Sequence, residues 1–130
     1  MAKKNVEANY SVEVAFCSRE LTAKERVMVK DTTDAMKLDR VTAEDAIVIK
    51  PDWYATLKIH NEKADDVDYE NFLIVDEDGM KYVTGSHSFM SSFKNIFDEM
   101  KDCSEEWAIK IYQVDSKNYA GKKFITCSIV

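Results

Sequence analysis

The chain has 130 residues, with 24 acidic side chains, 18 basic side chains and a formal net charge of -6. Its 45% hydrophobic content can fill a core, and three Gly and one Pro exclude collagen-like and low-complexity classes. No run approaches the ~20 apolar residues of a membrane span. The start MAKKNVEANY lacks the apolar stretch of a signal peptide. We therefore expect one cytoplasmic domain over residues 1–130.

Net acidity argues against a nucleic-acid partner, but the charge is unevenly distributed. Residues 1–60 carry ten basic and ten acidic side chains, for a net charge of 0. Residues 61–106 carry four basic and thirteen acidic side chains, net -9, and residues 107–130 carry four and one, net +3. The C-terminal quarter is therefore basic within an acidic protein, and phosphate binding requires such basic side chains.

The cysteines predict neither a disulfide framework nor a metal site. Cys17, Cys103 and Cys127 are odd in number and widely spaced, with no CxxC, and His60 and His87 lie at no ligand spacing from them. In a reducing cytoplasm we expect free thiols. The sequence predicts no cofactor.

Residues 1–50 are expected to form a β-rich N-terminal extension. Tyr10, Val12, Val14 and Phe16 alternate with smaller or polar residues, which predicts a strand over 10–16. The secondary structure of the next segments is less clear. Residues 18–30 begin with helix formers and end in a strand-like RVMVK. Residues 36–38 could form a short strand or a helical turn, and residues 46–49 are a short β-branched run.

Residues 51–130 give a sharper pattern of elements. Strands are predicted by period-two alternation and by the turn residues Asp78-Gly79. A helix is predicted by an apolar stripe at positions 89, 93, 96, 97 and 100, and Ser86 or Ser88 can cap it. The predicted elements are strands over 53–60, 69–75 and 80–84, a helix over 87–101, and strands over 107–112 and 124–130.

The β-β-β-α-β-β order, with long loops at 61–68 and 115–122, is that of an OB-fold. We therefore expect a mainly β, α+β fold, with an OB-like core over 51–130. This core is a five-stranded barrel with one helix between strands three and four, which places Phe89, Phe93 and Phe97 at one end of the barrel. Other small α+β domains share these elements. The N-terminal strands could also join the sheet, and the strand count would then differ.

Alternation also assigns faces to the strands. We take the apolar set Trp53, Ala55, Leu57 and Ile59 as inward, and the opposite set on each strand as outward. In the middle hairpin both alternating sets are apolar, so both faces can be covered there. Aromatic rings interleaved with lysines are what single-stranded nucleic acid needs, because bases stack on rings and cations follow the backbone. The candidate nucleic-acid-binding residues are Tyr54, Lys58, His60, Lys110, Tyr112, Lys117, Asn118, Tyr119, Lys122, Lys123 and Phe124.

Each ring has an alternative interpretation, because Tyr and Phe also favour strands for packing alone. The first 50 residues could cover this face. The acidic stretch 62–70 lacks the ligand order of a calcium loop and is expected to be solvated. No GxSxG, glycine-rich phosphate loop or HExxH occurs, so we expect no enzymatic activity.

Three segments resemble a known family: KYVTGSHSFMSSFKNIF over 81–97, WAIKIY over 107–112 and SKNYAGKKFITC over 116–127. Together they resemble small single-stranded DNA-binding or replication-accessory proteins of bacteriophages that infect Gram-positive hosts. The resemblance implies an OB-type fold, a single-stranded DNA partner, and a viral protein that acts in DNA replication or recombination in the host cytoplasm. Replication or recombination proteins and further copies of the chain would be additional partners. The chain departs from many such proteins by ending in a strand-like FITCSIV rather than an acidic tail.

We therefore expect a protein that binds single-stranded DNA with little sequence specificity. The alternative is an acidic protein-interaction module that inhibits a host nucleic-acid enzyme, as a DNA mimic, through residues 61–106. A structural component of the virion is a third hypothesis.

Overall fold

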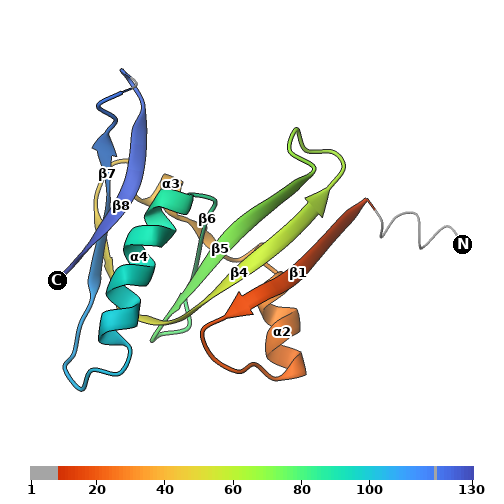
Figure 1. Ribbon diagram of the computed structural model, residues 1–130, viewed down its shortest axis with the longest axis horizontal. Coiled ribbons are helices and arrows are strands. Elements are labelled where there is room, and N and C mark those ends of the chain that lie inside the picture. The colour runs from red at the N-terminus through yellow and green to blue at the C-terminus, as the bar shows by residue number, and fades with distance from the viewer. Residues whose placement is uncertain (1–8, 119) are drawn as a thin grey trace, which may run out of the picture.

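Segments with apolar residues on alternate positions form strands, and these strands form two sheets (Figure 1). The computed structural model describes residues 9–118 and 120–130. The strands are β1 Tyr10–Cys17, β2 Met36–Lys37, β3 Ile47–Ile49, β4 Pro51–Asn61, β5 Asp68–Asp76, β6 Lys81–Thr84, β7 Ile109–Asp115 and β8 Lys123–Ile129. The helices are α2 Ala23–Lys30, α3 Leu38–Val41 and α4 His87–Met100. The large sheet has the order β1-β4-β5-β6-β2, and the small sheet has the order β3-β7-β8.

One stretch of chain, residues 47–61, joins the two sheets. β3 pairs with β7 in the small sheet, and β4 then pairs with β5 in the large sheet. The change of partner falls at Lys50 and Pro51. Proline has no N–H to donate to a ladder, so it is tolerated at the first residue of a strand. The only proline of the chain therefore stands at the bend between the sheets.

Helix α4 packs between the large sheet and the small sheet. Its stripe of Phe89, Phe93 and Phe97 is buried, as the periodicity predicts. The Ser86 hydroxyl accepts a hydrogen bond from the Phe89 N–H at 3.2 Å and caps the helix. We call this cluster the helix-side core; its buried members are Leu38, Ile49, Tyr54, Phe72, Ile74, Tyr82, Phe89, Met90, Phe93, Phe97, Ile109, Ile111, Ile125 and Cys127.

The opposite face of the large sheet is covered by the N-terminal segment. Within the ambiguous segment 18–30, residues Ala23–Lys30 form α2. Thr22 is the N-cap of this helix and forms a capping box with Glu25. Val29 of this helix is buried against the sheet. The second core contains Val29, Trp53, Ala55, Leu57, Ile59, Leu73, Val75 and Val83. The apolar run of β5 is thus covered on both faces, which confirms the expectation for the middle hairpin.

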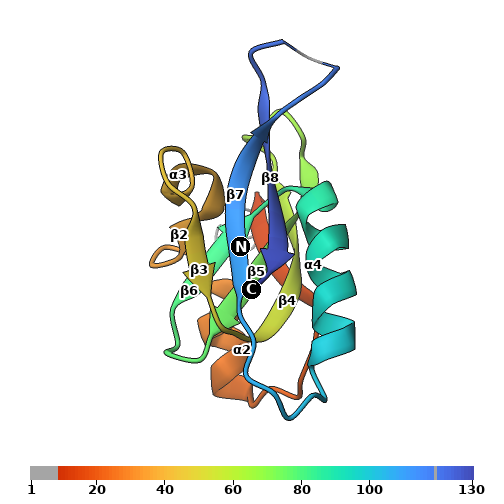
Figure 2. The ribbon, with the colours of Figure 1, turned by 90° about the vertical axis from the view of Figure 1, so that its left-hand side faces the viewer.

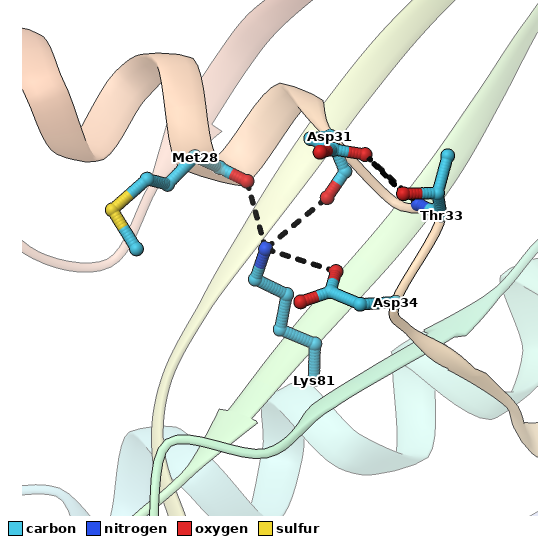
Figure 3. A network of polar contacts seen from close by, with 5 residues as sticks. All are labelled: Met28, Asp31, Thr33, Asp34 and Lys81. Atoms are coloured by element: carbon cyan, nitrogen blue, oxygen red, sulfur yellow. Dashed lines mark hydrogen bonds and ion pairs between the residues drawn. The ribbon is translucent and has the colours of Figure 1, made fainter.

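Lys81 ties the end of α2 to the start of β6 (Figure 3). Its ammonium group donates to the backbone carbonyls of Met28 and Asp31 at 2.9 and 3.1 Å, and pairs with the Asp34 carboxylate at 3.2 Å. The Lys81 side chain is only 15% exposed, so three acceptors replace most of its water. The positive charge also lies at the C-terminal end of α2, where the helix dipole favours a cation.

The structure differs from several of the sequence predictions about the fold. The described residues form eight strands in two sheets, and no ladder among them closes these sheets into one barrel. The five-stranded count is therefore wrong, because β1 and β2 join the large sheet and β3 joins the small sheet, the alternative left open by the sequence. β1 joins β4 because its apolar side chains Val12 and Val14 pack on the second core. The extension also contains two helices besides its strands.

Candidate nucleic-acid interface

The outer face of the small sheet points away from α4 and carries one exposed ring, Phe124, and one half-buried ring, Tyr112. In register across the three strands, Val48, Lys110 and Ser128 lie side by side, followed by the pair Tyr112 and Thr126. Val114 and Phe124 form the next pair. Alternate residues of the same strands enter the helix-side core, so the period of two separates a buried face from an open one. Phe124 on β8 remains 45% exposed, and Val48 is exposed on β3 at the other edge of the sheet.

Tyr112 is held in place at the centre of this face. Its hydroxyl shares a 2.8 Å hydrogen bond with the Ser128 hydroxyl on the neighbouring strand. The Lys110 ammonium lies over the Tyr112 ring, 5.7 Å from its centroid. An exposed cation–π contact contributes roughly 0.5–1 kcal/mol, whereas a stacked base contributes roughly 1–3 kcal/mol. The contact with Lys110 is therefore weaker than the stacking of a base on such a ring.

Phe124 supplies a second ring next to Tyr112. Thr126 is directly opposite Tyr112, and Phe124 stands two residues earlier on β8, so the two rings are diagonal neighbours. Diagonal neighbours in an antiparallel sheet are about 7–8 Å apart, within reach of aromatic side chains. The outer face of the small sheet therefore offers two rings to one short strand of nucleic acid.

The loop between β7 and β8 carries the positive charge of this region. The Ser116 N–H donates to the Lys122 carbonyl at 2.9 Å, and Gly121 adopts φ 79°, a left-handed conformation that glycine accepts without strain. Lys117, Asn118 and Lys122 are exposed in the loop. Lys123 is exposed at the start of β8, opposite Asp115. Tyr119 was also predicted as a binding residue and lies outside the described residues.

Tyr54 does not belong to an exposed surface, contrary to the sequence prediction. It is 5% exposed and packs edge-on against Phe93 and Phe97, with ring centroids 5.4 and 5.2 Å away. Burial raises the pKa of its phenol. The face of β4 that we expected to point outward is the face that α4 covers, and α2 covers the other. Both faces of β4 are therefore interior along this part of the strand.

Lys58 and His60 lie on the far half of β4, beyond the cover of α4, and they are surrounded by carboxylates. Lys58 stands in register between Glu13 of β1 and Glu70 of β5. The His60 Nδ1 is 2.8 Å from the Asp68 carboxylate. This hydrogen bond raises the pKa of His60 above its ordinary value. The structure thus separates these two residues from Tyr112 and Phe124 of the small sheet and surrounds them with negative charge.

The predicted site therefore divides into three parts. Lys110, Tyr112 and Phe124 share the outer face of the small sheet, with Lys117, Asn118, Lys122 and Lys123 at the adjoining hairpin. Tyr54 is in the core, and Lys58 and His60 are on the large sheet. The sequence prediction missed Val48 and Val114 on this face, and it placed Ser128 on the outward face without counting it among the binding residues.

The cysteines stand apart from one another, and they differ in exposure. Burial raises the pKa of the Cys127 thiol to about 11. Cys103 is exposed and Cys17 is half-buried. Within residues 9–118 and 120–130, no group of His, Cys, Asp or Glu side chains could hold a metal ion.

Comparison of the chain with protein-family models, with curated proteins and with solved structures finds no significant match. Of the helices in the described part of the chain, none has the length and apolar character that a membrane crossing requires.

Proposed function

We propose that this protein binds single-stranded DNA with little sequence specificity, on the outer face of the small sheet and the β7–β8 loop. The observation that carries the proposal is that the half-buried Tyr112 and the exposed Phe124 lie on one face of the small sheet, next to a loop that carries Lys117 and Lys122. Stacking accepts every base because every base has an aromatic face, so such a surface discriminates little between sequences.

The charge of the whole chain limits how tightly one copy can hold DNA. Residues 107–130 have a net charge of +3, while the protein as a whole is at -6. Few phosphates can therefore be neutralised by one copy. We expect stacking to supply much of the affinity, with several copies acting together on longer strands.

The arrangement of strands supports an OB-like interpretation of residues 47–130. The stretch 47–61 bends from the small sheet into the large one, β5 and β6 continue the meander, α4 follows, and β7 and β8 complete the small sheet. We propose that this is an open OB-like barrel to which β1 and β2 have been added. The resemblance of segments 81–97, 107–112 and 116–127 supports a role in protecting or organising DNA during phage replication or recombination.

A fluorescence-anisotropy titration of labelled oligo-dT, at low salt and at physiological salt, tests the proposal. We expect saturable binding that weakens as salt rises, because DNA binding releases counterions. Binding no tighter than millimolar, or binding that does not respond to salt, contradicts it.

The competing hypothesis, an acidic module that mimics DNA, requires a continuous acidic surface. Acidic side chains of residues 61–106 occur in the loop 61–68, in the turn 76–78, near the end of α4 and in the loop 101–106. The turn and the loop 101–106 meet at Lys50, whose carbonyl accepts from the Glu77 N–H at 2.9 Å and whose ammonium lies 3.9 Å from the Glu106 carboxylate. Figures 1 and 2 show the loops 61–68 and 101–106 at opposite ends of the molecule, the first beyond β4 and β5 and the second below α4. Mimicry would therefore use one of two separate acidic regions. Co-purification of a host protein that persists after nuclease treatment would favour mimicry over DNA binding.

A further inference from the structure

A β-bulge in β1 turns Phe16 onto a different face from the one its sequence pattern predicts. Val14 pairs with Leu57 of β4, but Phe16 pairs with Thr56, so Ala15 is an extra residue in the ladder. A bulge of this kind reverses the alternation that follows it and re-aims a side chain. Val12 and Val14 point into the second core, whereas Phe16 lies on the face that α4 partly covers.

Phe16 remains 50% exposed at that position, beside the mouth of a groove. The groove lies between β1, β4 and β5 on one side and the N-terminal half of α4 on the other. Its volume of about 450 Å³ falls within the range of ~300–1,000 Å³ that small-molecule sites occupy. Its apolar walls include Phe16, Phe72 and Met90, and its polar lining includes Glu70, Ser91 and Lys94.

The polar groups of the groove stand around an aromatic floor. The Lys94 ammonium lies 6.0 Å from the centroid of the Phe72 ring. The His87 ring contacts the Phe72 ring edge-on, with the two ring centroids 5.0 Å apart. The Ser91 hydroxyl donates to the His87 carbonyl at 3.2 Å and retains acceptor capacity. The groove therefore combines an exposed ring, a cation, a hydroxyl and a carboxylate.

We propose that this groove holds one unstacked base of a single-stranded DNA, with Phe16 as its stacking surface and Lys94 beside the neighbouring phosphate. A nucleobase has flat apolar faces and an edge of N–H and C=O groups. Phe16 fits the face, and both the Glu70 carboxylate and the Ser91 hydroxyl oxygen can accept from N–H groups of the edge. This inference rests on the proposed function and adds a second contact site to it.

The position of the groove allows one strand to reach both sites. The β7–β8 hairpin and the β4–β5 hairpin project to the same end of the molecule in two perpendicular views (Figures 1 and 2). The N-terminal half of α4, which forms one wall of the groove, lies toward that end. A strand that leaves the β7–β8 loop and crosses this end therefore passes the groove.

Photo-cross-linking of the wild-type protein to an oligo-dT that contains 5-iododeoxyuridine tests the placement directly. Mass spectrometry of the digested complex should find cross-links at Phe16 as well as at Tyr112 or Phe124. Cross-links confined to Tyr112 and Phe124 overturn the groove inference and leave the proposed function standing. Failure of the wild-type protein to bind the oligonucleotide at all overturns both.

Anisotropy titrations of variants supply the second test. Phe16→Ala should weaken binding about tenfold, in line with the loss of one stacked base, and Phe16→Trp should retain affinity. Tyr10→Ala is the matched control, because Tyr10 is 52% exposed on the same strand but faces the other side of the sheet. Lys94→Ala should lower the slope of log affinity against log salt by about one, and Lys101→Ala should not. Equal affinities for Phe16→Ala and Tyr10→Ala, with unchanged melting temperatures, contradict the inference.

Discussion

Two long hairpins project to the same end of this protein and carry opposite charge (Figure 1). Residues 51–76, which form the β4–β5 hairpin, contain seven acidic side chains and two lysines, for a net charge of -5. Residues 109–129, which form the β7–β8 hairpin, contain four lysines and one aspartate, for a net charge of +3. Similar architecture thus supports two different electrostatic surfaces.

The comparison is clearest between two lysines on central strands. Lys58 has Glu13 and Glu70 as its cross-strand neighbours, whereas Lys110 has Val48 and Ser128. Opposite charges at such positions attract each other, and a paired ammonium is less available to a phosphate. A lysine on a strand therefore indicates a phosphate contact only when its neighbours across the sheet are known.

The largest effect is expected from reversing charge in the basic hairpin. Lys117→Glu combined with Lys122→Glu should weaken single-stranded DNA binding roughly 100-fold at physiological salt and lower the salt slope by about two, because two phosphate contacts are lost. Anisotropy titration measures both. Lys24→Glu with Lys63→Glu changes the net charge equally and should leave the affinity within about threefold. Equal losses in the two double variants would show that only net charge matters.

A smaller loss is expected when the central ring of the small sheet is removed. Tyr112→Ala should weaken binding about tenfold at every salt concentration, because stacking contributes roughly 1–3 kcal/mol per base. The salt slope should stay unchanged, which separates this effect from that of the lysines. Tyr112→Phe keeps the ring, loses only the hydrogen bond to Ser128, and should bind nearly as well. An unaltered affinity of Tyr112→Ala would remove the outer face of the small sheet from the site.

The smallest effect concerns pH and belongs to the acidic hairpin. The hydrogen bond to Asp68 raises the pKa of His60 in the folded state above its ordinary value of 6.5. The resulting stabilisation is fully present below that ordinary value, and it is lost as pH rises through the raised pKa. Thermal unfolding should therefore separate wild type from His60→Gln by more at about pH 5.5 than at about pH 8.5. A difference that does not vary with pH would show that the imidazolium–carboxylate pair contributes nothing.

Much of the fold could be predicted because its signals are local. The alternation in β4, β5, β7 and β8, the Asp78-Gly79 turn and the phenylalanine stripe of α4 all depend on residues a few positions apart. The structure confirms the order of elements over 51–130 and the helix, which ends at Met100. The basic loop of the candidate site is also visible in the sequence, because Lys117, Lys122 and Lys123 lie close together along the chain.

The sequence by itself therefore determined which segments of residues 51–130 become strands or a helix and where positive charge is concentrated. Tertiary structure decided which faces remain open. Alternation shows that β4 has two faces, but it does not reveal that α4 covers Tyr54 and α2 covers the opposite face. The bulge at Ala15, which turns Phe16 toward the groove, and the carboxylates beside Lys58 arise from pairing between β1, β4 and β5. Exposure and electrostatic neighbours depend on contacts between residues distant in the chain, and local periodicity does not contain them.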